Sequence, residues 1–300
     1  MRGYSMDNEK MDIIKNNNGF IAALDQSGGS TPKALKMYGV PEDSYNGEEE
    51  MFDMIHDMRT RIITNQYFNN EKIIGAILFE QTIDRKIDGL YIGDYLWNEK
   101  GIVPFLKVDQ GLAREENGVQ LMNPLTNLDQ LLKRAKERNI FGTKMRSLIK
   151  TVDPKGIKDI VDQQFEIGQK IYDAGLIPIL EPEVDINSPT KSESETIMKE
   201  EILKHLNKLD RDIKFMFKLS IPSKDNFFKE IIDHERVLRV VALSGGYTRE
   251  NANKKLGKNP KLIASFSRAL TEGLSIDQND EEFNNTMKDS VDKIYKASIK

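Results

Sequence analysis

The sequence contains no cysteine, only one tryptophan and only three histidines. Without cysteine, the chain forms no disulfide, has no thiolate nucleophile and holds no cysteine-ligated zinc or iron–sulfur centre. His56, His205 and His234 lie far apart in sequence and in predicted helices or at their edges, which is typical of surface histidines. We therefore expect no metal site and no cofactor, although a magnesium site made only of carboxylates stays open at this point.

Long apolar runs are also missing. No run approaches the roughly 20 residues that span a membrane, and residues 1–18 are polar and lack the apolar core of a secretory signal. The net charge of −4 argues against general affinity for nucleic acid or anionic membranes. We expect a cytoplasmic protein that binds neither, and the sequence leaves a homo-oligomer open.

Nucleotide-binding glycine motifs are absent as well. No GxGxxG follows the first apolar run, and no GxxxxGK[ST] occurs, so neither a dinucleotide site nor a P-loop is predicted. No change of composition and no linker marks a domain boundary. Residues 1–300 are therefore predicted to form one domain, with residues 1–18 as a polar N-terminal extension.

What the sequence does contain is a regular alternation of apolar runs and helical segments. Parallel strands need crossover connections, and these are usually helices, so the alternation predicts a parallel α/β sheet. Eight repeats in 300 residues favour a closed (β/α)₈ barrel, the TIM barrel, over an open doubly wound sheet. The eight strand candidates are residues 20–24, 73–79, 101–109, 141–147, 176–184, 213–220, 237–243 and 262–266.

Charged residues gather at or near the carboxyl ends of these runs, and in a barrel that end is the catalytic face. Residues two apart on a strand share a face, so the members of each pair Lys144/Arg146 and Glu181/Glu183 are expected to point the same way. The acidic residues also fit a role as internal counter-ions for buried lysines. The charged residues at these ends are Asp25, Glu80, Lys107, Lys144, Arg146, Glu181, Glu183, Lys218 and Arg268.

Lys218 stands inside the apolar run 213–220. Burial lowers the pKa of a lysine ammonium, and a partly neutral amine can attack a carbonyl to form a Schiff base. A strand-end lysine can instead extend its ammonium to water. The neighbouring charges favour the nucleophile, because a second cation such as Lys144 disfavours another positive charge and Glu181 or Glu183 can move protons.

Two segments are suited to binding phosphate. Ser244, Gly245 and Gly246 end the seventh run, and Arg268 follows the eighth, which is where barrels commonly hold a phosphate group. Glycine lets backbone N–H groups approach the anion, and arginine is a multidentate partner, although Ser-Gly-Gly also fits a simple tight turn. The segment 27–30, Ser-Gly-Gly-Ser, predicts a second anion site with Lys107 as its cation.

Between about residues 19 and 269 the chain resembles class I fructose-1,6-bisphosphate aldolases. The resemblance implies a (β/α)₈ lyase that cleaves fructose 1,6-bisphosphate reversibly into dihydroxyacetone phosphate and glyceraldehyde 3-phosphate, in glycolysis and gluconeogenesis, through a lysine Schiff base without metal. The matching pieces are AALDQSGGS at 22–30, GAILFE at 75–80, LKVD at 106–109, KMR at 144–146, LEPE at 180–183, FKL at 217–219, LSGG at 243–246 and SFSRAL at 265–270.

The resemblance also implies roles for individual residues. Lys218 matches the Schiff-base lysine, Glu181 the general acid/base that forms and hydrolyses the imine, and Asp25 the group that handles the C4-hydroxyl proton. Lys144 and Arg146 resemble the cationic pair that supports this chemistry. Glu183 resembles a carboxylate that partners Lys144 or Lys218; Ser244, Gly245, Ser267 and Arg268 match the C1-phosphate site; and Ser27, Ser30 and Lys107 match the region that receives the other phosphate.

The sequence departs from the family pattern at two places. The animal enzymes end in a mobile tail closed by a functional tyrosine, whereas Tyr295 falls in a predicted helix here. Ala34, flanked by Lys33 and Lys36, stands where the family has an arginine. A transaldolase-like or tagatose-bisphosphate aldolase and a barrel that binds phosphosugars or protein partners without catalysis remain alternatives at this point.

Overall fold

The structure is a computed structural model that describes residues 7–27 and 29–300. Residues 1–6 of the polar N-terminal segment and Gly28 of the first Gly/Ser turn lie outside the described residues.

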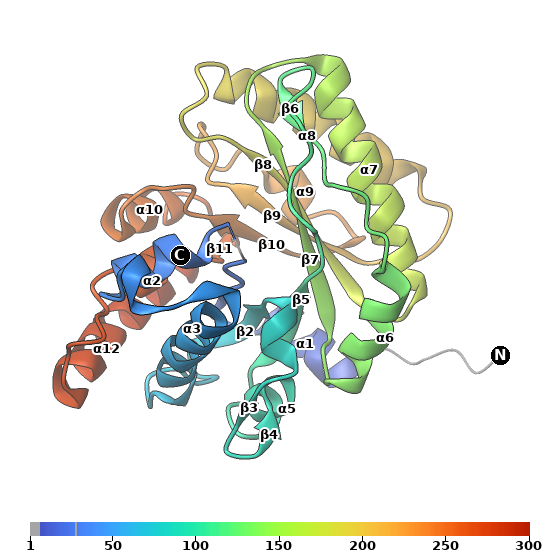
Figure 1. The fold of residues 1–300 in the computed structure, drawn as a ribbon. Coiled ribbons are helices and arrows are strands. Elements are labelled where there is room, and N and C mark those ends of the chain that lie inside the picture. The colour runs from blue at the N-terminus through green and yellow to red at the C-terminus, as the bar shows by residue number, and fades with distance from the viewer. Residues whose placement is uncertain (1–6, 28) are drawn as a thin grey trace.

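Eight parallel strands form the wall of a barrel (Figure 1). Neighbouring strands pair in chain order, and the wall closes where the backbone N–H of Ala23, in the first strand, donates to the carbonyl of Phe266 directly after the last, at 3.2 Å. The predicted (β/α)₈ barrel is confirmed. Its strands are β1 (Phe20–Leu24), β2 (Ile73–Leu78), β5 (Val103–Lys107), β7 (Gly142–Ile149), β8 (Ile177–Val184), β9 (Phe215–Ser220), β10 (Val237–Leu243) and β11 (Ile263–Ala264).

Helices connect the strands and cover the outside of the barrel (Figure 1). The sequence shows why they form: in α7, for example, Ile157, Ile160, Val161 and Ile171 fall on one face and are buried, and Gly175 follows the helix with φ +88°. The helices are α2 (Thr31–Met37), α3 (Gly47–Thr64), α4 (Glu80–Ile83), α5 (Ile92–Asn98), α6 (Leu128–Glu137), α7 (Pro154–Asp173), α8 (Lys191–Lys208), α9 (Lys229–Ile232), α10 (Arg249–Leu256), α11 (Arg268–Thr271) and α12 (Asp280–Ser298), with a 3₁₀ turn at Glu42–Ser44.

Side chains inside the barrel change character along several strands. Alternate residues point inward, and on β5, β7, β8 and β9 the inward positions near the carboxyl ends include charged residues. On β8, Ile177 and Ile179 belong to the apolar interior cluster, and Glu181 and Glu183 continue the same face. The apolar layer therefore fills the lower part of the barrel, and the charged layer lines its open end.

The amino end of the barrel is closed by α1 (Asn8–Asn16), which forms from the segment predicted to be a polar extension. Ile14 of this helix is buried in the interior apolar cluster. Arg239 of β10 donates to the carbonyls of Ile14 and Lys15, both at 2.8 Å, and of Asn17 at 3.0 Å. The last carbonyls of a helix have no partner within the helix, and here the guanidinium of Arg239 supplies the donors. These bonds fix α1 against the amino ends of the strands.

Three short strands were not predicted from the sequence: β3 (Lys86–Ile87) and β4 (Leu90–Tyr91) form a hairpin, and β6 (Val119–Gln120) pairs antiparallel with β7. Among the described residues, no helix combines the length and the apolar character needed to cross a bilayer.

Candidate active site

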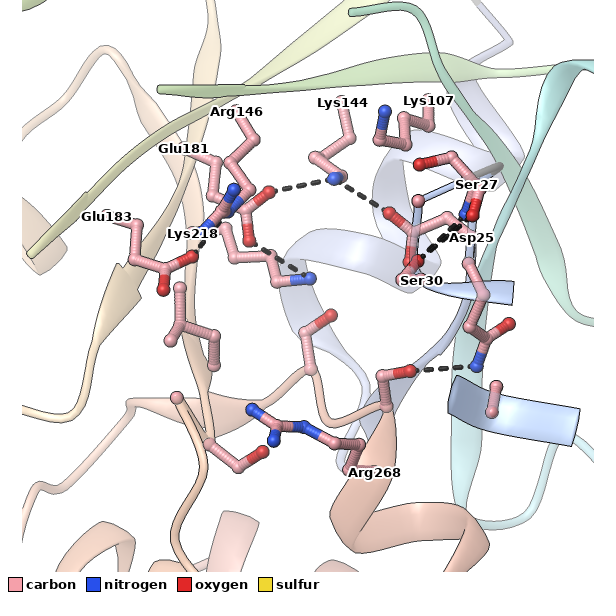
Figure 2. Close-up of a pocket in the computed structure, with 18 of the residues that line it drawn as sticks. Asp25, Ser27, Ser30, Lys107, Lys144, Arg146, Glu181, Glu183, Lys218 and Arg268 are labelled. Carbon is pink, nitrogen blue, oxygen red and sulfur yellow. Dashed lines mark hydrogen bonds and ion pairs between the residues drawn. The ribbon is translucent and has the colours of Figure 1, made fainter. Parts of the chain in front are cut away.

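A cleft of about 520 Å³ opens at the carboxyl end of the barrel (Figure 2). Six cationic side chains and four carboxylates face it, and a cleft lined in this way suits a substrate that carries negative charge. The structure brings the residues with predicted catalytic or phosphate-binding roles to this one cleft: Asp25, Ser27, Ser30, Lys107, Lys144, Arg146, Glu181, Glu183, Lys218, Ser244, Gly245, Ser267 and Arg268.

Four charged side chains from four strand ends form a continuous chain of ion pairs across the floor of the cleft (Figure 2). Lys218 Nζ lies 3.2 Å from Glu181 Oε1, and Lys144 Nζ lies 2.8 Å from Glu181 Oε2 and 2.7 Å from Asp25 Oδ2. None of the four residues is more than 9% exposed. A carboxylate within reach of both lysines can exchange protons with either, which is the arrangement that amine-to-carbonyl chemistry requires.

The charges in this chain control one another. Burial opposes ionisation of Asp25, but the positive charges of Lys144 and Lys218 outweigh it and hold the pKa of the carboxyl well below its ordinary value. Burial likewise opposes the charge on Lys144, yet Asp25 and Glu181 raise the pKa of its ammonium well above the ordinary value. At neutral pH the cleft therefore holds an ionised Asp25 beside a protonated Lys144.

A second group of ion pairs lies along the β5 and β7 side of the cleft. Arg146 Nε donates to Glu183 Oε2 at 2.6 Å, while its backbone N–H donates to Asp109 Oδ2 at 3.0 Å. Lys107 Nζ donates to the other oxygen of Asp109 at 2.6 Å. Burial disfavours the charge on Arg146, but Glu183 outweighs burial and raises the pKa of the guanidinium. These contacts hold the two cations facing the opening.

Two expectations about carboxylates were wrong. Glu183 was expected to partner Lys144 or Lys218, but its ion-pair partner is Arg146, two residues along the same inward face of β7. Glu80 was placed with the charged residues of the catalytic face, but it begins α4 on the outside and pairs with Arg134 of α6 at 2.5 Å. The polypeptide turns into a helix directly after β2, so Glu80 does not continue the inward face of that strand.

Two loops hold the predicted C1-phosphate residues. Gly245 and Gly246 have φ of +61° and +119°, and a Cβ at Gly245 would lie 2.5 Å from Ile186 Cγ2, so glycine is required there. The guanidinium of Arg268 lies against Gly246, since a Cβ at that glycine would be 3.4 Å from Arg268 Nη2. The turn after β10 and the start of α11 thus approach each other across one corner of the cleft.

The predicted second anion site is a compact turn before α2. The backbone N–H of Ser27 donates to Ser30 Oγ at 3.0 Å, and that of Ser30 donates to the carbonyl of Ser27 at 2.8 Å. Lys33 of α2 also lines the cleft on this side. The side chains of Ser27 and Lys107 both face the opening here (Figure 2).

Sequence reasoning missed three residues that shape the site. Asp109 fixes Lys107 and Arg146, and Gln26 donates from Nε2 to Ser267 Oγ at 2.9 Å, which ties the loop after β1 to the loop after β11. Arg59 of α3 is 2% exposed and donates to the carbonyl of Gln26 at 2.7 Å. Asp109 and Gln26 could have been predicted, because both stand at the ends of apolar runs in segments that match the aldolase family. Nothing in the sequence distinguishes Arg59 from an exposed helix residue.

Among residues 7–27 and 29–300, no group of three or more histidine, aspartate or glutamate side chains is arranged to hold a metal ion.

The sequence matches a family model described as "Glycolytic: Fructose-bisphosphate aldolase class-I" over residues 6–221. The chain belongs to the class I fructose-bisphosphate aldolase family. It is also 60% identical over 294 residues to fructose-bisphosphate aldolase class 1 of Clostridium acetobutylicum, an alignment that covers 98% of this chain and all of the relative. The expected family is confirmed: the chain is a lyase of a family that acts on phosphorylated sugars.

A co-crystal structure of fructose-bisphosphate aldolase from Plasmodium falciparum, in complex with TRAP and a small-molecule inhibitor, has a similar fold. The TM-score is 0.71 at 20% sequence identity, and the superposition covers 96% of this chain and 92% of the other. At that identity the likeness shows the barrel fold alone.

Proposed function

We propose that this class I aldolase cleaves fructose 1,6-bisphosphate reversibly into dihydroxyacetone phosphate and glyceraldehyde 3-phosphate through a Schiff base on Lys218, in cytoplasmic glycolysis and gluconeogenesis. The observation that carries the proposal is the 3.2 Å approach of Lys218 Nζ to Glu181 Oε1 on the floor of a cleft rich in cations. A nucleophilic amine needs an acid/base partner within this distance.

The first step joins the substrate to the enzyme. The uncharged amine of Lys218 attacks C2 of the open-chain ketose, and the carbinolamine loses its hydroxyl as water to give a protonated imine. Glu181 supplies the proton for the departing water and later takes it back. Because Lys144 contacts the other oxygen of Glu181, at 2.8 Å, the carboxylate keeps one oxygen directed at Lys218.

The second step breaks the C3–C4 bond. Asp25 takes the proton of the C4 hydroxyl, the aldehyde leaves, and the bonding electron pair moves into the protonated imine, which becomes an enamine. The iminium is the electron sink, so the scheme needs no metal or other cofactor. The lowered pKa of Asp25 keeps its carboxylate ionised at neutral pH, so an unprotonated acceptor is present in the cleft. Protonation of the enamine at C3 and hydrolysis of the imine free Lys218.

The cleft offers a separate group of residues for each of the two phosphates. Backbone groups of the turn at Gly245 and the guanidinium of Arg268 approach one corner of the cleft and suit the C1-phosphate, with Ser244 and Ser267 beside them. The turn from Ser27 to Ser30, with Lys107 across from it, suits the other phosphate; both serines and Lys107 line the cleft.

Reduction with borohydride in the presence of dihydroxyacetone phosphate tests the proposal. The imine should be trapped as a stable secondary amine, and mass spectrometry of the digested protein should place the added mass on Lys218 and find none on a Lys218→Met variant. An adduct on another lysine, or aldol cleavage that EDTA abolishes, would contradict the scheme.

Substrate profiling tests the choice of sugar. Cleavage of fructose 1,6-bisphosphate should exceed that of tagatose 1,6-bisphosphate and of sugars that lack the second phosphate. The reverse preference would favour a tagatose-bisphosphate or transaldolase-like activity, and no turnover of any of them would favour a binding protein.

A further inference from the structure

The ladder between β8 and β9 is interrupted beside the two reacting residues. β8 pairs with β7 from Gly142/Ile177 to Ile149/Val184, whereas β8 and β9 pair only at Ile179/Met216 and Leu180/Phe217. The pairing ends at Leu180/Phe217, and the next residue of β8 that would face β9 is Pro182, which has no backbone N–H. Backbone N–H groups two residues apart point to the same neighbouring strand, and that of Val184 points to β9, so Pro182 lacks its donor on the β9 side.

One side chain restores the connection above this gap. Ser220 Oγ donates to the carbonyl of Val184 at 2.5 Å and accepts from the backbone N–H of Val184 at 3.1 Å. Ser220 is 1% exposed, and Val184 is fully buried. A single hydroxyl therefore satisfies both backbone groups of Val184 that the interrupted ladder leaves without a strand partner, and a buried backbone group without a partner is costly.

Glu181 and Lys218 lie inside this gap. Below them, Leu180 and Phe217 are joined by the ladder, and above them Val184 is joined to Ser220. The backbones that carry Glu181 and Lys218 are thus fixed to each other at both ends of a short unpaired stretch. The two strands are held at a set separation there without being paired in a ladder.

We propose that Ser220 is a positioning residue that sets the distance between Lys218 and Glu181, and this inference rests on the proposed function. The carboxyl end of β9 is paired with β10 up to Ser220/Leu243 but not with β8. Without the Ser220 link, its separation from β8 is no longer fixed on that side, and the 3.2 Å contact between Lys218 Nζ and Glu181 Oε1 widens. Misplacement of a reacting group by about 1 Å costs up to about 100-fold in rate.

A buried ion pair on α8 holds the chain on the other side of Ser220. Lys191 Nζ contacts Glu195 and donates to the carbonyl of Ile221 at 2.8 Å, and Glu195 Oε2 accepts from the backbone N–H of Ser223 at 3.0 Å. Lys191 and Glu195 are 8% and 1% exposed. The segment that leaves β9 is therefore fixed to α8, while the Ser220 hydroxyl ties this end of β9 to β8.

Steady-state kinetics and borohydride trapping of a Ser220→Ala variant test the proposal. The kcat for fructose 1,6-bisphosphate and the rate of trapping with dihydroxyacetone phosphate should both fall by about 10- to 100-fold. The KM should stay within about twofold, because the Ser220 hydroxyl bonds to Val184 and not to a residue of the proposed phosphate sites. Ser220→Thr, which keeps the hydroxyl, should recover most of the rate, and Ser220→Cys, whose thiol is a weak donor, should lie between Thr and Ala.

Ser194→Ala is the matched control. Ser194 on α8 is also buried, but its hydroxyl has no hydrogen-bond partner among residues 7–27 and 29–300, so kcat should not change. A Ser220→Ala enzyme with unchanged kcat and trapping rate overturns the inference, and so does a loss that Ser220→Thr, folded by circular dichroism, fails to recover. If Ser220→Ala does not fold, the kcat and the trapping rate of Ser220→Cys are compared with those of Ser220→Thr, and the same outcomes decide. Failure of trapping in the wild-type protein would instead contradict the proposed function.

Discussion

Lys144 Nζ lies 2.7 Å from Asp25 Oδ2, and both side chains are almost entirely removed from water. Burial of an ion pair gives little net stability, because desolvation of the two charges offsets their attraction. Its effect here is on protonation: the pKa of Asp25 is lowered and that of Lys144 raised. Lys144 thus separates the proposed base, Asp25, from the proposed acid/base, Glu181, and keeps Asp25 in its ionised form.

Replacement of Lys144 by methionine should expose this dependence. Lys144→Met keeps most of the side-chain volume but removes the charge that most strongly lowers the pKa of Asp25, so that pKa should rise. We expect kcat to fall by at least about 100-fold and the acid limb of the kcat/KM profile to move to higher pH. The pH profile of the purified variant measures both, with Lys155→Met on the exposed face of α7 as control. An acid limb at the wild-type position would contradict the assignment.

The same pair predicts how stability depends on pH. The pKa of Asp25 is lower in the folded protein than in the unfolded chain, so its contribution is present above the unfolded value of about 3.9 and is lost as the pH falls below it. Asp25→Asn removes this contribution. Between about pH 5 and pH 3, the free energy of unfolding in urea should therefore fall more steeply for the wild type than for the variant. Parallel curves would show that Asp25 titrates normally.

The sequence predicted the barrel and the contents of its open end because both follow from one-dimensional patterns. Short apolar runs separated by helical segments leave few architectures open, and charged residues at the carboxyl ends of parallel strands must meet at one rim. Glu181 and Lys218 follow the inward apolar residues Ile179 and Met216 on their strands, so their convergence was predictable. The family resemblance added roles that the spacing alone does not supply.

Which charged side chains form ion pairs with each other in the cleft was not predictable in the same way. Alternation gives the face of a strand but not the height of a residue relative to its neighbour. The register sets Arg146 of β7 opposite Glu181, yet its guanidinium pairs with Glu183, two residues further along β8. The prediction for Glu80 was wrong because β2 ends at Leu78, before that residue. Contacts that depend on three elements at once, such as the hydrogen bonds of Arg59 to Gln26 and to Thr82 of α4, are visible only in the folded structure.

The buried pair on α8 predicts a loss of stability. Glu195→Gln leaves the ammonium of Lys191 buried without its anionic partner, and burial already lowers the pKa of that lysine. Removal of one member of a buried pair costs about 3–5 kcal/mol. Chemical denaturation should show a loss of this size in the free energy of unfolding, while Glu193→Gln, at an exposed position on the same helix, should change it by less than about 0.5 kcal/mol. Equal effects would mean that the α8 pair contributes nothing specific.

Gln26 should influence substrate affinity through Ser267. Because Ser267 Oγ accepts the Gln26 N–H at 2.9 Å, its own hydroxyl hydrogen is available for another acceptor, and in the proposed complex that acceptor is the C1-phosphate. Gln26→Leu removes the donor and lets Ser267 rotate. A lost hydrogen bond to a charged group is worth about 1.5–3 kcal/mol, so the KM for fructose 1,6-bisphosphate should rise by about 10-fold or more, with a smaller change in kcat.

The KM for fructose 1-phosphate distinguishes an effect of Gln26 on the C1-phosphate site from damage to the other phosphate site. If Gln26 acts through the C1-phosphate, Gln26→Leu should raise the KM for fructose 1-phosphate by the same factor as for the bisphosphate, because both substrates carry that group. Gln130→Leu, an exposed position on α6, should leave both constants unchanged. A KM that rises only for the bisphosphate would instead place the effect of Gln26 at the Ser27–Ser30 turn, to which it is joined along the chain.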